Sequence, residues 1–330
     1  MANAVEKVNT IAIASIEAIN GITDGNLQAL NGLEFTGVVP YNGITWSTND
    51  TLPVVMSFGI KFGIIGAQGV ANCNDKNATG WKATYEHNGS SWSTTGNVAG
   101  THGVGCGGGT QGAGVIASGW DDVGNDETNV TEEYNGSSWS TGNNMVSGSA
   151  YATGGGTLQT AQLVTGGSSY GPTVRDLSMT QTYDGTNWAN ESVASDGRGS
   201  GAAGESGGGG LDAFFSANGA NESGGANTNT QLFDQSAGSW TSKAAAGASL
   251  AYLTASTDGT RVYKIGGNPY TTLVESWVEN TWTTESVLPA ATNGPGQGTG
   301  GLESAAGNAS AIGGNTSGGQ QSAYYTAAAS

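Results

Sequence analysis

Apolar and polar positions recur along this chain with a long, nearly constant period. Tryptophan marks each period, at Trp46, Trp92, Trp139, Trp188, Trp240 and Trp282, with steps of 42 to 52 residues. A short apolar run lies upstream of each tryptophan, and Asn-Gly or Asp-Gly often stands before it with two residues between. A repeat of this length, rich in Gly and Thr, is typical of a β-propeller in which each period forms one four-stranded blade. We therefore predict an all-β propeller over residues 36–330.

Residues 149–188 illustrate the strands expected in one blade. Residues 149–156 (SAYATGGG) are small and suit an inner strand, and residues 161–167 (AQLVTGG) form an apolar second strand closed by two glycines. Residues 177–183 form a third strand, and Asp184-Gly185 turns the chain back into a fourth, as a tight hairpin requires. We expect the aromatic residue before each such turn and the tryptophan after it to be buried against the neighbouring blades. These structural residues are Tyr85 and Trp92, Tyr134 and Trp139, Tyr183 and Trp188, Phe233 and Trp240, and Trp277 and Trp282.

Six apolar second strands match the six tryptophans. They are KFGIIGA (61–67), GVIASG (114–119), AQLVTGG (161–167), DAFFSANG (212–219), RVYKIGG (261–267) and NASAIGG (308–314). An apolar run, a Gly pair, and a Tyr and a Trp about six residues apart resemble the kelch repeat, over roughly residues 38–330. The Gly pair is complete in three repeats and altered to Gly66-Ala67, Ser118-Gly119 and Asn218-Gly219 in the others. The resemblance implies a six-bladed kelch-like β-propeller.

The two ends of the repeat region are complementary. Residues 320–326 (QQSAYYT) read as a third strand without a following turn and tryptophan, and residues 41–46 supply that missing piece at the other end. We therefore predict that the N-terminal strand around Trp46 completes the last blade, because closure leaves no free sheet edge.

Residues 1–35 have a different pattern and are predicted to be a short α-helical segment. Apolar residues fall at helical spacing at Val5, Val8, Ile11, Ala12, Ile16 and Ile19. Asn20-Gly21 is a suitable helix end, and a second short helix is expected to reach Leu30. The helix either folds back on the propeller or serves as an anchor. We favour the anchor because the apolar face is wide, and these six residues are its expected partner-binding positions.

Charge narrows the choice of partners. The net charge of −17, from 26 acidic and 9 basic residues, argues against nucleic acid as a partner. It favours a soluble protein whose copies repel one another because they carry like charge. The first 20 residues lack the pattern of a signal peptide and are too polar to cross a membrane. Cys73 and Cys106 are expected to be free thiols, because spacing alone does not indicate a bridge.

The catalytic inventory is sparse. His87, expected in an exposed turn, and His102 are the two histidines, and no pair with metal-ligand spacing or nucleophile motif accompanies them. The acids between Asp121 and Glu133 are the best candidate for a Ca²⁺ site, but they lack EF-hand spacing and are read as a solvated loop. We predict no catalytic residues, no cofactor and no enzyme activity.

A second resemblance concerns the N-terminal segment. Residues 8–37 (VNTIAIASIEAINGITDGNLQALNGLEFTG) look like the N-terminal segment of structural proteins from tailed phages, especially cyanophages. The sequence NGSSWST, present at 88–94 and 135–141, is similar to kelch-like propellers of those phages. The resemblance implies a virion location, as a head decoration, fibre or tail-appendage protein that binds other virion proteins and presents its propeller to host surface glycans. Self-association is left open.

Two other functions remain alternatives from the sequence. One is a carbohydrate-binding or carbohydrate-cleaving propeller with paired carboxylates, for which Glu205, Asp212 and Glu303 are the kind of residue needed. The other is an intracellular kelch-type interaction scaffold.

Overall fold

The computed structural model divides the chain into two compact units, Met1–Gly43 and Ile44–Ser330, whereas the sequence suggested a boundary after residue 35. The described residues are 7–8, 11–12, 18–19, 22–23, 29–30, 33–34, 45–48, 51–54, 56, 58–73, 81–121, 123–124, 126–167, 179–194, 202–205, 214–217, 226–257, 261–278, 280–285, 287–288, 291–293, 309–312, 315–316 and 322–326. No helix among these residues is long and apolar enough to cross a membrane.

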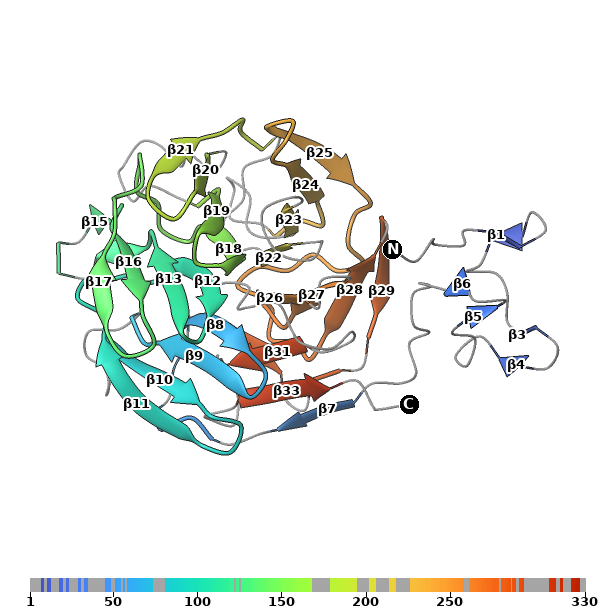
Figure 1. Cartoon of the computed structure of the whole chain (residues 1–330), viewed down its shortest axis with the longest axis horizontal. Coiled ribbons are helices and arrows are strands. Elements are labelled where there is room, and N and C mark those ends of the chain that lie inside the picture. Colours follow the sequence, from blue (N-terminus) through green and yellow to red (C-terminus); the bar gives the residue numbers. More distant parts are fainter. Residues whose placement is uncertain are drawn as a thin grey trace. The chain divides into compact units, whose positions relative to one another are not determined.

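The second unit is a β-propeller of antiparallel sheets (Figure 1). Sheet 1 contains β8 (Ile60–Ile64), β9 (Ala67–Ala71), β10 (Ala83–His87) and β11 (Trp92–Asn97). Sheet 2 contains β12 (Cys106–Thr110), β13 (Ala113–Ala117), β16 (Thr131–Tyr134) and β17 (Trp139–Thr141). Sheet 3 contains β18 (Thr153–Leu158), β19 (Ala161–Thr165), β20 (Thr180–Tyr183) and β21 (Trp188–Asn190). Sheet 5 contains β26 (Thr254–Thr257), β27 (Val262–Ile265), β28 (Val274–Val278) and β29 (Thr281–Thr284).

The blade count differs from the six equivalent blades predicted. Sheets 1, 2, 3 and 5 are the four blades whose strands are described with their side chains. Sheet 4 contains β22 (Ala202–Glu205), β23 (Phe214–Ala217), β24 (Thr230–Asp234) and β25 (Ser239–Lys243), and only its two outer strands have described side chains. Sheet 6 has three strands, β31 (Ala309–Ile312), β33 (Ser322–Thr326) and β7 (Thr45–Thr48), with Trp46 opposite Tyr325. Among the described residues, β30 (Thr292–Asn293) and β32 (Asn315–Thr316) form a separate two-stranded pair.

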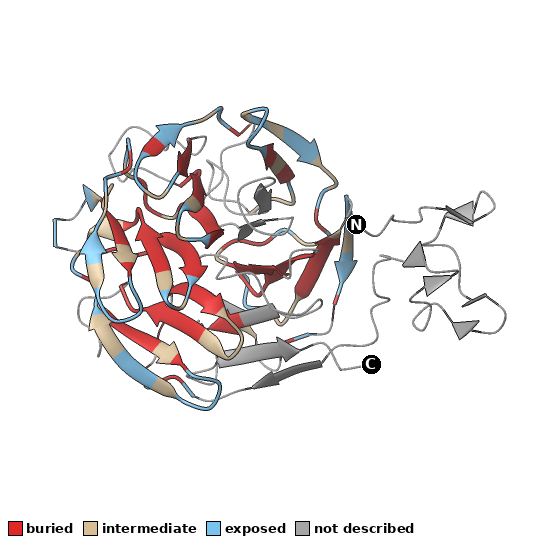
Figure 2. Ribbon diagram, viewed as in Figure 1, coloured by how far each residue is buried: buried red, intermediate tan, exposed pale blue. Residues whose placement is uncertain are grey.

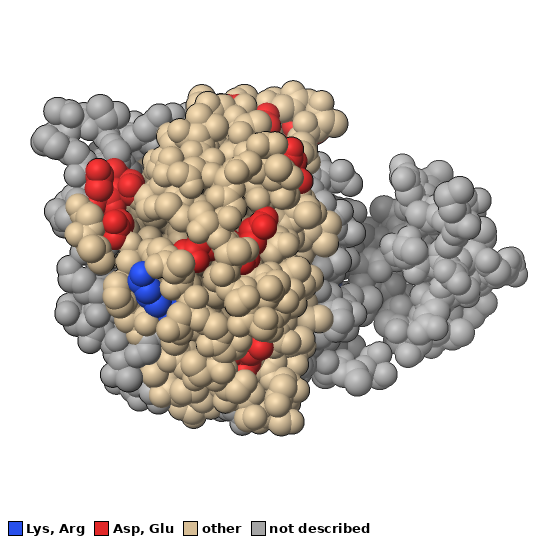
Figure 3. Space-filling view, turned by 60° about the vertical axis from the view of Figure 1, so that its left-hand side comes forward, with Lys and Arg blue, Asp and Glu red and all other residues tan. Residues whose placement is uncertain are grey.

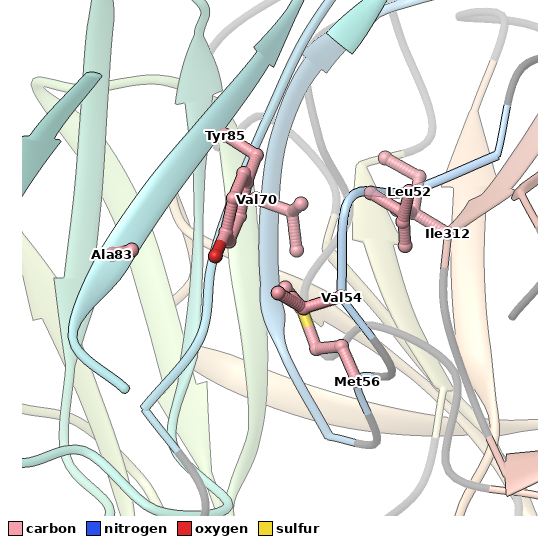
Figure 4. Close-up of a cluster of buried hydrophobic side chains, with 7 residues drawn as sticks. All are labelled: Leu52, Val54, Met56, Val70, Ala83, Tyr85 and Ile312. Carbon is pink, nitrogen blue, oxygen red and sulfur yellow. The ribbon is translucent and has the colours of Figure 1, made fainter. Parts of the chain in front are cut away.

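The hydrophobic core lies between consecutive sheets, and the outermost strands carry the exposed positions (Figure 2). One cluster joins Cys106 and Ala117 of sheet 2 to Val164 and Tyr183 of sheet 3. Another brings Ile312 of sheet 6 against a group in and before sheet 1 (Figure 4); its other members are Leu52, Val54, Met56, Val70, Ala83 and Tyr85. In these clusters, neighbouring blades bury their facing surfaces against each other, which is how a twisted sheet removes its apolar faces from water.

In four sheets, the repeated tryptophan also links its blade to the one before it by a hydrogen bond. Its indole Nε1 donates to a threonine hydroxyl on the third strand of the preceding sheet. The pairs are Trp139 with Thr84 at 2.7 Å, Trp188 with Thr131 at 2.8 Å, Trp240 with Thr180 at 3.0 Å and Trp282 with Thr230 at 3.1 Å. Trp188 is only 8% exposed, so its bond is shielded from water.

We expect Trp188→Phe to lower the free energy of unfolding by about 1–2 kcal/mol, because phenylalanine keeps the ring contact with Tyr183 but removes the buried donor to Thr131. Trp92→Phe is the matched control, since Trp92 Nε1 is buried and has no hydrogen-bond partner among the described residues. That control should cost less than about 0.5 kcal/mol, because it removes an unsatisfied donor. Equal losses in urea denaturation would show that ring volume, not the hydrogen bond, matters at this position.

Sheet 1 is in a different phase from that predicted. The run KFGIIGA was expected to be a second strand, but Ile60–Ile64 is the first strand and Ala67–Ala71 the second. The residue opposite Trp92 is accordingly His87 and not Tyr85. Tyr85 precedes His87 by two residues and belongs to the hydrophobic cluster of Figure 4. His87 is fully buried, with its ring 5.1 Å from that of Trp92, so the expectation of an exposed turn was wrong. A planar ring of similar width takes the place that an aromatic residue holds in the other sheets.

The helix predicted for the N-terminal unit is also wrong at the residues that the structure describes. Three antiparallel pairs occur there: β1 (Lys7–Val8) with β2 (Ile11–Ala12), β3 (Ala18–Ile19) with β4 (Ile22–Thr23), and β5 (Ala29–Leu30) with β6 (Leu33–Glu34). Of the six expected partner-binding residues, Val8, Ile11, Ala12 and Ile19 lie in these strands; Val5 and Ile16 lie outside the described residues. Two residues separate the strands of each pair, and Asn-Gly at two of these connections favours a hairpin over a helix.

Candidate functional site

A recurrent backbone feature marks the entry to the inner strands. Phe58, Val104, Tyr151 and Tyr252 have φ values of 55°, 51°, 58° and 55°, and each stands two residues before the first strand of sheet 1, 2, 3 or 5. A positive φ is rare for a large side chain and costs about 1–3 kcal/mol. Because it recurs at one place in four blades, the surrounding fold imposes it.

Backbone hydrogen bonds hold the residues directly before the first strand of a sheet, which we call the entry segment. In sheet 2, Gly103 and Trp120 exchange two backbone bonds, of 2.9 and 2.5 Å, across the start of the loop after the second strand. In sheet 5, Ala251 and Asn268 do the same at 3.3 and 2.6 Å. The N–H of Tyr151 donates to the carbonyl of Val104 in the preceding sheet at 3.1 Å. The entry segment is thus fixed to its own blade and to its neighbour.

The Gly pair of the sequence repeat allows the end of the second strand to lie close to the residues that precede the first strand. Gly167 has a φ of 94°, and a Cβ there would lie 1.9 Å from Ser149 Oγ and 2.7 Å from the Ala150 carbonyl oxygen. Gly267 has a φ of 124°, and a Cβ there would lie 2.9 Å from the Ala251 carbonyl oxygen. The pair therefore follows from close contact between the second strand's end and the entry segment.

Three aromatic rings from these positions meet across the propeller axis. The ring of Tyr252 lies 5.7 Å from that of Phe58 at an interplanar angle of 78°, and 6.2 Å from that of Tyr151 at 69°. Their sheets are not neighbours: the inner strands follow one another in the order β8, β12, β18, β22, β26 and β31 (Figure 1). Rings from sheets 1, 3 and 5 can only meet where the inner strands converge. We call Phe58, Tyr151 and Tyr252 the axial aromatic cluster, and all three rings are half-buried.

The cluster lies on the face of the propeller that carries the varied loops. In an antiparallel blade, the connection into the first strand and the loop between the second and third strands leave from the same end. Those loops include the hairpin of β14 (Trp120–Asp121) and β15 (Asp126–Glu127), and residues 266–273 with Tyr270, which is 47% exposed. The opposite end carries the short turns at Asn88-Gly89, Asn135-Gly136 and Asp184-Gly185. We call the first end the loop face.

His102 lies near this face, and both of its ring nitrogens are engaged in contacts within the protein. Its Nδ1 is 2.8 Å from the Ser118 carbonyl oxygen, and its Nε2 is 3.2 Å from Glu132 Oε1, with both side chains completely buried. Glu132 also accepts the N–H groups of Ala99, at 2.8 Å, and Gly100. Burial alone would raise the pKa of Glu132, but the hydrogen bonds from His102 and the two backbone groups outweigh it and hold that pKa below its usual value. This group therefore holds the chain between sheets 1 and 2.

The same position is polar in other sheets, two residues before the aromatic of the third strand. In sheet 3, Gln181 Oε1 accepts the Val146 N–H at 2.8 Å and Gln181 Nε2 donates to the Ser147 carbonyl at 3.1 Å. In sheet 5, Glu275 accepts the Gly247 N–H at 3.0 Å and pairs with buried Lys264. Burial lowers the pKa of Lys264. We call these side chains the connector clamps.

The described acids of the stretch from Asp121 to Glu133 serve separate positions, and Asp122 lies outside the described residues. Glu132 serves as a clamp, Glu133 accepts the Tyr183 hydroxyl at 2.7 Å, and Asp121 accepts from Thr101 and the Val123 N–H. Among the described residues, no three His, Cys, Asp or Glu side chains come together as metal ligands would. On the face shown in Figure 3, acidic side chains are scattered among uncharged ones. The stretch supplies local hydrogen bonds from separate positions.

Both cysteines are free and buried. Burial raises the pKa of Cys106 to about 12 and raises that of Cys73 above its usual range, so neither thiol forms a thiolate at neutral pH. They pack as small apolar side chains between sheets.

The repeat residues lie as partners across the third and fourth strands. Ring centroids are 4.9 Å apart for Tyr134 and Trp139, 5.0 Å for Tyr183 and Trp188, and 5.2 Å for Phe233 and Trp240. Trp277 lies opposite Trp282 in the strand register. The axial aromatic cluster was missed by sequence reasoning, which treated residues 149–156 as a run of small inner residues. The available signal was a Tyr two residues before an inner strand in two repeats, Tyr151 and Tyr252.

Comparison with known proteins gives a fold and no more. No family model matches the chain, and no curated protein sequence matches it. Among solved structures, the one described as "Structure of YjhT" superposes with a TM-score of 0.66 and 13% sequence identity, covering 84% of this chain and 96% of that one. The likeness at this identity concerns the fold alone, and it agrees with the sheet arrangement: the second unit of this chain is a β-propeller.

Proposed function

We propose that this protein is a non-enzymatic structural component of a phage virion, a head decoration, fibre or tail-appendage protein. Its N-terminal segment docks on capsid or tail proteins, and its loop face binds a host surface glycan. The axial aromatic cluster is the observation that carries the binding part of the proposal. The resemblance of residues 8–37 and of the NGSSWST repeats to phage proteins motivates the virion part.

The cluster suits a sugar ring for physical reasons. Aromatic faces stack on the apolar C–H face of a pyranose, and tyrosine adds a hydroxyl that reaches a sugar hydroxyl. The three rings are held by backbone in a strained conformation, so little side-chain entropy is lost on binding. Strain of this kind is retained where the arrangement has a use.

We further propose that the propeller is a six-bladed kelch-like ring. Five four-stranded sheets and one three-stranded sheet follow one another in the chain. Ile312 of the last sheet packs in the cluster of the first (Figure 4), and β7 from the N-terminal side pairs with β33 from the C-terminal side. These contacts support closure of a ring between sheets 6 and 1.

The glycan proposal is tested by replacing one ring at a time. Tyr252→Asn removes the ring and keeps a residue that tolerates positive φ, so the fold is expected to persist. We expect affinity for oligosaccharides of host surface polysaccharide to fall about tenfold, corresponding to about 1.4 kcal/mol. The measurement is isothermal titration with the full chain, alongside thermal unfolding.

Tyr270→Asn is the matched control, because Tyr270 is an exposed loop tyrosine of the same sheet outside the axial aromatic cluster. It should change affinity less than about twofold. Equal loss in both variants, or no binding by the native chain, would remove the cluster as the glycan site.

Cleavage of the oligosaccharide would contradict the non-enzymatic proposal. Glycoside hydrolysis ordinarily needs two carboxyl groups about 5–9.5 Å apart. Of the acids considered from the sequence, Glu205 lies in β22 without a described side chain, and Asp212 and Glu303 lie outside the described residues. Product analysis after incubation therefore accompanies the binding measurement.

The docking part has a separate test. Removing residues 1–35 should abolish association with phage particles in co-sedimentation, if these residues form the attachment element. Undiminished association of the shortened chain would refute that role and leave the glycan site unaffected.

A further inference from the structure

The N-terminal unit contains an eleven-residue repeat that the helical interpretation concealed. Apolar residues recur at three offsets: Val5, Ile16, Leu27 and Val38; Val8, Ile19, Leu30 and Tyr41; and Ile11, Ile22, Leu33 and Ile44. Asn follows the second offset in every copy, at Asn9, Asn20, Asn31 and Asn42, and Gly follows it in three. Steps of three residues within each copy imitate helical spacing, which accounts for the incorrect prediction.

In three copies, the described residues at the second and third offsets lie in β strands with constant register. Val8 lies opposite Ile11, Ile19 opposite Ile22, and Leu30 opposite Leu33. Each pair closes around two residues, and Asn-Gly is the sequence that such two-residue hairpins prefer. The fourth copy, residues 41–44, runs directly into β7.

A unit of this size rarely forms a sufficient core from one chain. An isolated two-stranded hairpin is marginal in water, and the described strands here have two residues each. Chains near 40 residues usually need disulfides, metal ions or oligomerisation to fold stably. Residues 1–43 contain no cysteine and no histidine, so disulfides are excluded and the usual soft metal ligands are absent.

We propose that residues 5–44 form a self-association stem, in which hairpins from several copies of this chain stack into one apolar core. A tandem repeat buries its apolar face by stacking on identical units. Each copy of the chain presents the same three apolar positions every eleven residues, so copies aligned in register match along their whole length. A foreign partner would need a surface with the same period. The inference deepens the docking role of the N-terminal segment by making its first partner this chain itself.

The test uses the full chain, whose monomer mass is 32.9 kDa. Light scattering after size exclusion should give one oligomer for the native protein, with a mass of two or more times that of the monomer. Ile22→Glu combined with Leu30→Glu places charge at two apolar positions of the repeat and should yield the monomer. Gln28→Glu is the matched control, because it adds charge at the offset already occupied by Glu6 and Glu17, and it should leave the mass unchanged.

A second variant separates hairpins from helices. An eleven-residue apolar period also fits a right-handed helical coiled coil. Gly21→Ala with Gly32→Ala removes the residues that a two-residue hairpin turn prefers and raises helix propensity by about 1 kcal/mol at each position. Dissociation of the variant supports the hairpin stem, and a tighter oligomer with increased helical circular dichroism overturns it.

Failure of this inference is distinguishable from failure of the proposed function. A native chain that is monomeric at tens of micromolar, or an oligomer that persists in the Ile22 and Leu30 variant, refutes the stem. Particle co-sedimentation and glycan titration are measured separately and do not depend on that result.

Discussion

Replacing Glu132 by alanine is expected to lower the free energy of unfolding by about 3–5 kcal/mol, because the change leaves buried donors without their acceptor. The carboxylate accepts from the Ala99 and Gly100 N–H groups and lies against His102 Nε2, and it is completely shielded from water. Urea denaturation followed by tryptophan fluorescence measures the loss. A cost below about 1 kcal/mol would show that water replaces the clamp.

Glu132→Gln is the informative companion variant. Gln181 performs the same clamp in sheet 3 with a neutral amide, so glutamine should restore part of the lost stability in sheet 2. We expect a cost of about 1–2 kcal/mol, since one amide oxygen replaces two carboxylate oxygens. A glutamine variant as unstable as the alanine variant would indicate that the charge is indispensable.

The stability of the native protein and that of Glu132→Gln should also depend differently on pH. The pKa of Glu132 is lowered in the folded protein, so its contribution is complete above the unfolded pKa of about 4.3 and is lost as the pH falls through the folded value. The stability difference between the native protein and Glu132→Gln should therefore be constant from pH 7 to about 5 and shrink below about 4. A difference that does not change in acid would contradict the carboxylate assignment.

Gly167→Ala should be nearly as damaging, with an expected loss of about 3 kcal/mol or more. The backbone there has a φ of 94°, and the new Cβ would overlap Ser149 Oγ at 1.9 Å and the Ala150 carbonyl oxygen at 2.7 Å. Ser149 is held on both sides, because its hydroxyl donates to the Gly166 carbonyl and its own carbonyl accepts from the Gly119 N–H. The Ala150 carbonyl oxygen belongs to the backbone and cannot move aside as a side-chain end could. Equilibrium urea denaturation provides the measurement.

Gly112→Ala is the control for this second prediction. A Cβ at Gly112 meets nothing within 4 Å, and no positive φ is involved. The change should be neutral or stabilise by a few tenths of a kcal/mol, because alanine restricts the unfolded chain more than glycine does. If both variants behave alike, the close crossing between strand end and entry segment does not limit stability.

The sequence was most informative where spacing and turn chemistry coincide. Asn135-Gly136 and Asp184-Gly185 each begin a four-residue hairpin loop, which places Tyr134 opposite Trp139 in sheet 2 and Tyr183 opposite Trp188 in sheet 3. The sequence was misleading where the same motif can arise from a different structural element. Gly66-Ala67 resembles the altered Gly pair, but Gly66 lies in the turn after β8 and Ala67 begins β9, so the prediction assigned β8 to the second strand of sheet 1 instead of the first.

The axial aromatic cluster could not be read in advance because it depends on contacts between distant segments. Phe58 and Tyr252 are almost 200 residues apart, and only ring closure brings their entry segments together. Positive φ at a tyrosine also has no local sequence signature. The N-terminal hairpins were misread for a different reason: three-residue steps fit a helix and an eleven-residue β repeat equally well, and Asn-Gly was taken as a helix end instead of a turn.

The placement of β7 has a mechanical consequence. Its four residues follow directly on the N-terminal unit, and β7 joins the rest of its sheet through β33. If the N-terminal unit is tethered and the loop face is held by a ligand, tension enters the propeller through the Thr45–Thr48 ladder before it reaches any complete blade. The pairing of β7 with β33 is therefore the first contact to bear the force. The force needed to break it sets the largest tension that the N-terminal connection can transmit before the propeller opens.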